Sequence, residues 1–219
     1  MPTATDRLRT AAEALSRLGR VVATVKGEEG QDPRLAKALA ILRTLSRKEN
    51  IPMAIVGGLG AIYHGYERLT KDIDVVVPAA LLDAIPRVAP HYGIKVNWKD
   101  RKGWHKLSFE SVNIDIVPEG GQPRKDSPRT IPGPKQLGVP QGLDYANLAG
   151  WLETKLSSYR AQDRADVVQV FKITSPSALA KARAQIGKAH LTYVERFDQL
   201  QAEAKEEKEQ ERKRGGRRS

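Results

Sequence analysis

The sequence predicts an α/β fold in which helices flank a mixed β-sheet. Leucine and alanine recur at helical spacing near both ends of the chain, short runs of β-branched residues fill its middle, and a glycine turn joins one such run to a helix. A chain of 219 residues with 40% hydrophobic residues has room for one packed core and a helical extension.

The first third of the chain predicts two helices followed by a strand, a helix and a strand. The helices are expected over residues 5–19 and 33–48, with the charged break "KGEEGQDP" between them. A buried strand over 51–56, a short helix over 59–66 and a second strand over 72–77 follow. The alternation of strand and helix indicates an α/β core.

The middle of the chain predicts three more strands. Residues 78–93 have a helical pattern that ends at Pro90, and strands are expected over 94–98, 104–110 and 112–117. The resulting order, βαβαβββ, indicates a mixed sheet. Residues 118–144 are rich in proline, glycine and basic residues, and a loop of that length is usually functional or disordered.

The last third predicts helices and a charged tail. Residues 145–172 return to helical periodicity, and one or two further helices follow. We therefore divide the chain into N-terminal helices over 1–50, a core over 51–144, a C-terminal helical region over 145–204 and a disordered charged tail over 205–219.

The composition indicates a polyanionic partner. The formal net charge is +11; the tail holds seven Lys and Arg against four Glu, a net +3, which leaves 11 − 3 = +8 for the body. A basic body favours contact with nucleotides or nucleic acid, while a basic surface that only serves solubility is the alternative.

Cysteine usage and hydropathy indicate a cytoplasmic protein. The chain contains no cysteine, which excludes disulfides and thiolate metal sites and fits a reducing cytosol. The longest apolar stretch, "IPMAIVGGLGAI", is well short of the roughly 20 residues that span a bilayer, and the N-terminus lacks an apolar signal region. We expect neither a membrane partner nor secretion.

Two aspartates in an apolar strand indicate a metal site. Side chains alternate along a strand, so Asp72 and Asp74 of "DIDVVV" share one face while Ile73, Val75 and Val77 point into the core. Two carboxylates about 7 Å apart repel each other unless a cation lies between them. Mg²⁺ prefers such oxygen ligands and is commonly held by one or two carboxylates together with substrate phosphates.

A third acid and a glycine turn extend this pattern. Asp115 stands alone in the apolar strand "VNIDIVP", and three acids on neighbouring strands can hold two metal ions for phosphoryl or nucleotidyl transfer. Gly57 and Gly58 follow the first strand and open a helix, where glycine allows close approach of a ligand and free amides attract phosphate.

Together these motifs resemble the DNA polymerase β-type nucleotidyltransferase superfamily. The stretch "VGGLGAIYHGYERLTKDIDVVV" is most similar to the AbiEii/AbiGii and MenT toxin-like branch. The resemblance implies a nucleotidyltransferase core in which Gly57 and Gly58 hold a triphosphate. It also implies that Asp72 and Asp74 bind both of two Mg²⁺ ions, and that Asp115 completes the catalytic metal site and helps to deprotonate the acceptor hydroxyl.

The same branch has a second signature that resembles "KLSSYRAQDRADVV". Lys155 and Asp166 lie eleven positions apart, so on one continuous helix they would share a face. Lys155 could then meet a phosphate and Asp166 could orient it or touch the nucleotide; a salt-bridged helix surface is the alternative. Arg68 and Thr70 match the first signature as phosphate contacts, although Thr70 alternatively shapes the turn. For His64 we expect a packed, hydrogen-bonded role.

Our leading hypothesis is transfer of a nucleoside monophosphate from an NTP to an acceptor hydroxyl with Mg²⁺ as cofactor. The basic body favours RNA as acceptor, in particular a tRNA 3′ end, and the toxin-like branch implies an antitoxin protein as a further partner. Alternatives with the same core modify a small molecule, such as an antibiotic, or a protein side chain. An alternative of another class is a non-catalytic nucleic-acid-binding module.

Overall fold

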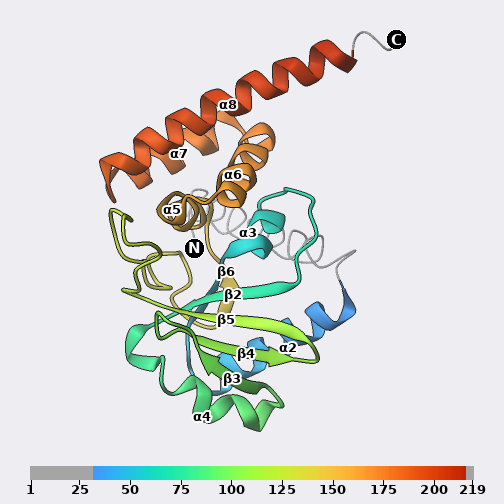
Figure 1. The fold of residues 1–219 in the computed structure, drawn as a ribbon, viewed down its shortest axis with the longest axis vertical. Coiled ribbons are helices and arrows are strands. Elements are labelled where there is room, and N and C mark those ends of the chain that lie inside the picture. The colour runs from blue at the N-terminus through green and yellow to red at the C-terminus, as the bar shows by residue number, and fades with distance from the viewer. Residues whose placement is uncertain (1–31, 216–219) are drawn as a thin grey trace, which may run out of the picture.

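The computed structural model describes residues 32–215, which form a six-stranded mixed sheet with helices against both faces (Figure 1). The strand order is β3-β4-β5-β2-β1-β6. The strands are β1 (Met53–Ile55), β2 (Asp72–Val77), β3 (Lys95–Lys99), β4 (His105–Phe109), β5 (Val112–Pro118) and β6 (Leu143–Tyr145). The β1/β6 and β2/β5 pairs are parallel and the other pairs are antiparallel. The predicted fold class is confirmed, and the helix expected over 5–19 lies outside the described residues.

One face of the sheet is covered by α2 (Pro33–Lys48) and α4 (Ile85–Val88). Helix α2 begins where predicted, because the Asp32 carboxylate caps the Arg34 amide at 2.9 Å and Pro33 suits the first helical turn. Its buried stripe consists of Leu35, Leu39, Leu42 and Leu45. Each fully buried leucine contributes about 1.5–3 kcal/mol of transfer free energy, so this stripe fixes the helix on the sheet.

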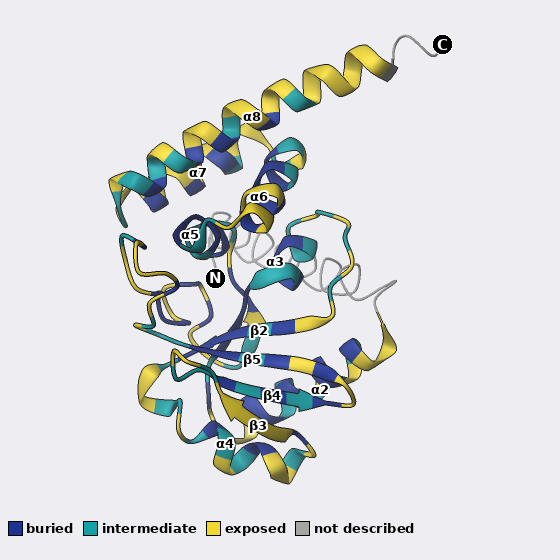
Figure 2. Cartoon of the chain, viewed as in Figure 1, coloured by how far each residue is buried: buried dark blue, intermediate teal, exposed yellow. Residues whose placement is uncertain are grey.

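The C-terminal helices cover only one end of the opposite face. They are α5 (Leu148–Ser158), α6 (Ala161–Ile173), α7 (Pro176–Gly187) and α8 (Leu191–Gly215), stacked beyond the sheet in Figure 1. Their core surrounds Trp151, Tyr193 and Phe197, which are fully buried, and it includes Val76 and Val117 from the sheet. The β3 end of this face is left exposed, as Figure 2 shows.

Two predicted helices have different bounds in the structure. The short helix α3 (Gly57–Tyr63) begins at the glycine pair and not at Leu59. Residues 78–93, expected as one helix, form three short turns: η1 (Ala79–Leu81), α4 and η2 (Ala89–Tyr92). Pro86 and Pro90 lack the amide hydrogen that a continuous helix needs, which explains the interruption.

The continuous helix predicted over 145–172 is wrong. Tyr145 belongs to β6, and the helical part breaks at Tyr159, whose φ of 46° lies in the left-handed region. Asp163 stabilises the new helix start, because its carboxylate accepts hydrogen bonds from the Arg160 amide and the Ser158 hydroxyl at 3.2 and 2.7 Å. The predicted face shared by Lys155 and Asp166 therefore does not exist on a single helix.

The loop and the tail also differ from expectation. Between β5 and β6 the chain has no helix or strand, yet it buries Ile131, Leu137 and Val139 against the C-terminal core. Helix α8 continues through the predicted disordered tail to Gly215, partly because Lys172 of α6 pairs with Glu207 and Glu211. None of the helices in residues 32–215 is long and apolar enough to cross a membrane.

Candidate active site

Three aspartates lie on the face of the sheet that the C-terminal helices leave partly open. Asp72 and Asp74 alternate with Ile73 and Val75, both fully buried on the other face. In the parallel pairing of β2 with β5, Asp74 lies directly opposite Asp115. The predicted proximity of these two acids is thus present, and Asp72 continues the row along β2.

Asp74 is held in a tight, negatively charged setting. Gly57, at φ +60°, lies so close that an added Cβ would be 1.9 Å from Asp74 Oδ2. Burial, followed by the charge of Asp115, raises the pKa of Asp74 to about 6, although Lys155 opposes the shift. The site therefore favours a positive charge beside this carboxylate.

The other two acids have partners of their own. Lys106 Nζ lies 2.5 Å from Asp115 Oδ2, and Asn113 donates a hydrogen bond to Asp72 Oδ1 at 3.0 Å. Within residues 32–215, no three His, Asp or Glu side chains are grouped closely enough to hold a metal ion as they stand. The donor chemistry nevertheless fits a hard divalent cation, since Asp72, Asp74 and Asp115 are carboxylates on one face and the repulsion on Asp74 calls for a cation.

Lys155 points into the site from α5 and is enclosed there. Its ammonium lies 3.0 Å from Asp163 Oδ1 and 2.7 Å from Asp166 Oδ2, both on α6. The two helices meet at the Tyr159 break, so the predicted contact between Lys155 and Asp166 exists for a different reason than the one expected. Two carboxylates hold the ammonium in place, a contact that fits both the orienting role and the salt-bridge alternative given for Asp166.

Asp166 is the centre of a buried charge network. Its side chain has no exposed surface and also accepts hydrogen bonds from Arg68 at 2.6 and 2.8 Å and from Gln162 at 2.9 Å. Arg68 is thereby tied to Lys155 through a shared carboxylate. Because Asp166 is enclosed, its position favours orienting the Lys155 and Arg68 side chains over contacting a nucleotide directly.

Asp163 and Arg160 also line the candidate site and were not named from the sequence. Burial alone would raise the pKa of Asp163, but the Lys155 ammonium and hydrogen bonds from Arg160 and Ser158 outweigh it and lower that pKa below its usual value. The available signal was an acid three residues before Asp166, one helical turn away. Arg160 Nε lies 2.9 Å from Asp163 while its side chain remains largely exposed.

The glycine pair and the turn before β2 lie beside each other. A Cβ added to Gly58 would be 2.8 Å from Thr70 Oγ1 and 3.7 Å from the Arg68 guanidinium carbon. The Thr70 hydroxyl makes a long 3.5 Å hydrogen bond to the Asp72 carbonyl, which fits the turn-shaping alternative. Gly57, Gly58, Arg68 and Thr70 thus converge on the start of α3.

A cavity lies beside Asp74 and Lys155. It lies between the sheet and α5, encloses about 100 Å³, and is lined by Gly57, Asp74, Trp104, Lys155 and Arg160 among others. Asp74 lies on the sheet side of this cavity, and Lys155, Arg160 and Asp163 lie on the helix side. An anion placed there with a cation against Asp74 would have complementary charge on both sides.

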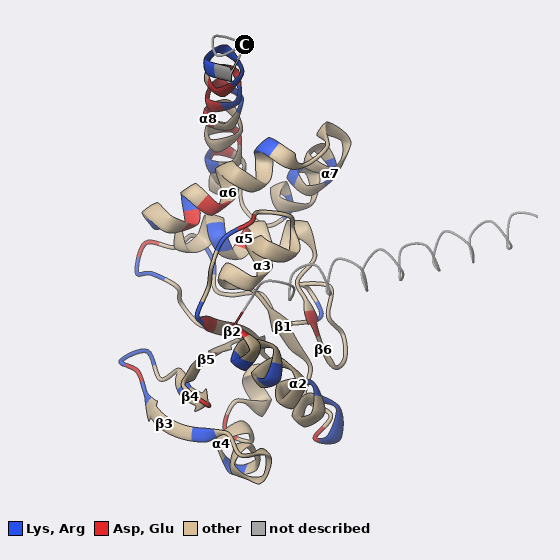
Figure 3. Cartoon of the chain, turned by 90° about the vertical axis from the view of Figure 1, so that its right-hand side faces the viewer, with Lys and Arg blue, Asp and Glu red and all other residues tan. Residues whose placement is uncertain are grey.

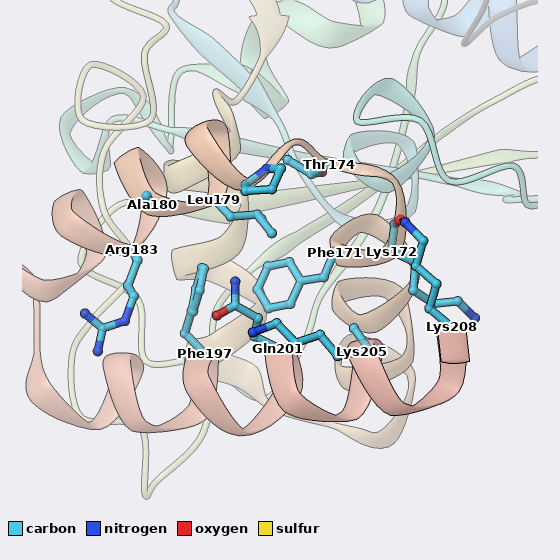
Figure 4. Close-up of a pocket in the computed structure, with 12 residues that line it drawn as sticks. Phe171, Lys172, Thr174, Leu179, Ala180, Arg183, Phe197, Gln201, Lys205 and Lys208 are labelled. Carbon is cyan, nitrogen blue, oxygen red and sulfur yellow. The ribbon is translucent and has the colours of Figure 1, made fainter. Parts of the chain in front are cut away.

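Two other features lie outside this arrangement. His64 Nε2 donates a hydrogen bond to the Ala146 carbonyl oxygen at 3.1 Å, and burial lowers the pKa of His64 to about 4, as suits the packed role expected for it. A larger groove between α6, α7 and α8 has Phe171, Leu179 and Phe197 in its floor (Figure 4). None of the predicted site residues lines that groove.

Comparison with known proteins gives structural similarity alone. No family model matches the sequence. No curated protein matches it either. Among solved structures, the chain is similar to the antibiotic-resistance factor ANT(2'')-Ia in solution, with 13% identity and a TM-score of 0.46 over 85% of this chain and 100% of that one.

Two tRNA-bound structures are also similar in fold. A tRNA nucleotidyltransferase complexed with a primer tRNA and an incoming ATP analog has 14% identity and a TM-score of 0.36, over 68% of this chain and 50% of that one. The CCA-adding enzyme of Thermotoga maritima complexed with tRNA has 18% identity and a TM-score of 0.33, over 81% and 53%.

Proposed function

We propose that this protein is a nucleotidyltransferase that moves a nucleoside monophosphate from an NTP to an acceptor hydroxyl. The observation that carries the proposal is the direct pairing of Asp74 with Asp115 beside a cavity whose far wall holds Lys155. Two neighbouring carboxylates can hold metal cations, and an ammonium across the cavity can contact a phosphate that lies between them. Nucleotidyl transfer needs both.

The residues have distinct roles in this proposal. Asp72, Asp74 and Asp115 would hold Mg²⁺, two ions by resemblance, and Lys155 would meet the triphosphate. Bound Mg²⁺ would supply charge neutralisation at the phosphates and lower the pKa of the acceptor hydroxyl. Asp163 and Asp166 hold the Lys155 ammonium in position, at 3.0 and 2.7 Å.

The phosphate contacts and the acceptor proton complete the scheme. Gly57 and Gly58 would contact the triphosphate through backbone amides at the start of α3, with the Arg68 guanidinium close to Gly58. Asp115 accepts the acceptor proton once the Lys106 ammonium, now 2.5 Å away, moves aside. The acceptor oxygen then forms a bond to the α-phosphorus, and pyrophosphate leaves in line.

The setting of Asp74 argues against the non-catalytic alternative. A nucleic-acid-binding module has no need for a carboxylate that is partly buried, that lies opposite a second carboxylate, and whose pKa is raised to about 6. Such a group costs stability without a cation to offset it. An active site is the simplest reason to keep it.

The test incubates purified protein with Mg²⁺ and each α-labelled NTP in turn, adding total tRNA, an aminoglycoside or no acceptor. Label should enter the tRNA with wild type and not with the Asp72→Ala, Asp74→Ala double variant. Label on the aminoglycoside or on protein would show that the acceptor is that molecule and not RNA. Absence of label with all acceptors, in a folded protein, contradicts the proposal.

The toxin-like role is a separate part of the proposal and rests on the motif resemblance alone. Induced expression in a bacterium should arrest growth with wild type and not with Asp74→Asn. A neighbouring gene product that restores growth would be the implied antitoxin. Growth that is equal with both chains would contradict the toxin role and leave the chemistry untouched.

A further inference from the structure

The open end of the sheet carries a row of paired residues that starts at the candidate active site. Asp74 of β2 is opposite Asp115 of β5, Asp115 is opposite Lys106 of β4, and Lys106 is opposite Trp98 of β3. Directly paired residues share a face of a sheet. At about 4.8 Å per strand, the row puts Trp98 about 14 Å from Asp74 on the same face.

A β-bulge brings Trp98 to this face. Val96 is opposite Leu107, which is buried on the face covered by α2 and α4. Simple alternation along β3 would therefore turn Trp98 toward that covered face as well. The register shifts between Val96 and Trp98, which makes Asn97 the extra residue and sets Trp98 opposite Lys106.

The neighbours of the bulge support this orientation. Ser108 donates a hydrogen bond to Asn97 at 3.3 Å on the open face. One residue beyond Trp98, Lys99 returns to the covered face, where it and His105 both reach Asp83, at 3.0 and 3.4 Å. The bulge therefore redirects one large aromatic side chain toward the active-site face.

Trp98 is unusually exposed for a large aromatic residue, at 61%. It lies on β3, the edge strand, along which every residue is exposed (Figure 2). Single exposed apolar residues are common, so exposure alone indicates little. Its place on the active-site row, reached through a bulge, indicates a ligand.

The surroundings of Trp98 are basic. The hairpin segment over residues 95–106 contains five Lys and Arg and one acid, Asp100, a net 5 − 1 = +4. Lys99 lies on the covered face and pairs with Asp83, and Lys106 pairs with Asp115, so Lys95, Arg101 and Lys102 carry the remaining positive charge. At the tip that joins β3 to β4, Figure 3 shows Lys and Arg next to an acidic residue. A strongly positive surface repels a cationic acceptor and attracts a polyanion. An aromatic face among cations is the usual platform for single-stranded nucleic acid, on which a base stacks while Lys and Arg contact the phosphates.

We propose that the β3–β4 hairpin binds single-stranded nucleic acid, with a base stacked on Trp98 and the strand directed along the row toward Asp115 and Asp74. This inference rests on the proposed nucleotidyl transfer for its purpose, since the bound strand would present the acceptor hydroxyl. Lys95 and Arg101 contact the backbone. A duplex cannot offer an unstacked base, so it binds only through charge.

Binding is tested apart from chemistry, with the full chain in the absence of NTP and Mg²⁺. The probe is a fluorescein-labelled single-stranded RNA of about 12 nucleotides, a length typical of such sites, followed by anisotropy. Trp98→Ala should weaken binding about tenfold or more, whereas Trp98→Phe, which keeps an aromatic face, should stay within about threefold. Leu191→Ala removes another exposed apolar side chain, 69% exposed on α8, and should have no effect.

Charge contributions are separated by salt. Lys95→Ala should weaken binding and reduce the slope of log affinity against log salt by about one, while Lys213→Ala near the end of α8 should leave both unchanged. Duplex RNA and single-stranded DNA of the same sequence serve as further probes. The single strands should depend on Trp98, and the duplex should not.

The outcomes distinguish this inference from the proposed function. Trp98→Ala binding as tightly as wild type overturns the inference, even if label transfer occurs. If no acceptor takes label but binding still depends on Trp98, the proposed nucleotidyl transfer is overturned and the proposed nucleic-acid-binding surface stands. A dimer in light scattering that Trp98→Ala converts to monomer would instead make β3 an interface between copies, and would also overturn the inference.

Discussion

Replacing Asp166 with Asn tests whether the buried charge network holds α5 against α6. The substitution keeps the size of the side chain and removes its charge, leaving Lys155 and Arg68 without a shared counter-ion. Asp166 has no exposed surface and accepts from Arg68 at 2.6 Å and from Lys155 at 2.7 Å. Breaking a buried pair usually costs 3–5 kcal/mol; Asp163 still pairs with Lys155, so we expect about 3 kcal/mol.

Asp198→Asn is the matched control. Asp198 also accepts two hydrogen bonds from one arginine, Arg183, at 2.6 Å each, but both side chains are nearly half exposed. Solvent screens such a pair, so its loss should change the free energy of unfolding far less. In urea unfolding followed by circular dichroism, a slope of about 2 kcal/mol/M places the Asp166→Asn midpoint about 1.5 M below wild type. Equal midpoints for the two variants would refute the reasoning.

Three further predictions concern the acids and His64. Gly57→Ala should lower label transfer by tenfold or more, because its Cβ would displace the Asp74 carboxylate. Gly142→Ala, also at positive φ but with open space around it, should lower stability slightly and leave transfer intact. Asp74→Asn should raise the melting temperature in EDTA at neutral pH, because the pKa of Asp74, about 6, lies above its usual value and folding therefore disfavours the charged carboxylate. A lower melting temperature for the variant would contradict this. Added Mg²⁺ should stabilise wild type more than the variant. Burial lowers the pKa of His64 to about 4, so the stability contributed by the neutral imidazole is complete above pH 6.5 and is lost as the pH falls from 6.5 toward 4. Over that range the melting temperature should fall more steeply with decreasing pH for wild type than for His64→Gln. The same dependence of melting temperature on pH in both proteins would refute this.

Five of the six strands, with their acids, could be predicted from the sequence; β6, which pairs with β1, lies where a loop and a helix were expected. Strand β2 has the predicted bounds because its alternation of Asp with Ile and Val already separates an open face from a buried one. The buried leucine stripe of α2 likewise follows from spacing within one element. Both are local patterns, in which the residues that decide the structure are close in sequence.

Features that depend on contacts between elements could not be predicted in the same way. The break at Tyr159 needs a left-handed residue and the Asp163 cap, and a helical pattern continues through both. The pairing of Lys106 with Asp115 depends on the register of β4 with β5. The orientation of Trp98 depends on a bulge that appears only once two strands are paired. Alternation along β3 alone gives the opposite face.

The most direct test of the central claim compares α-labelled with γ-labelled NTP, using wild type, the preferred nucleotide and the acceptor that takes label. Nucleotidyl transfer predicts that the α-label enters the acceptor while the γ-label leaves in pyrophosphate, and that Asp74→Asn abolishes both. Entry of the γ-label into the acceptor would show a kinase. Release of the γ-label as inorganic phosphate, with no label on the acceptor, would show hydrolysis. Either result would contradict the account.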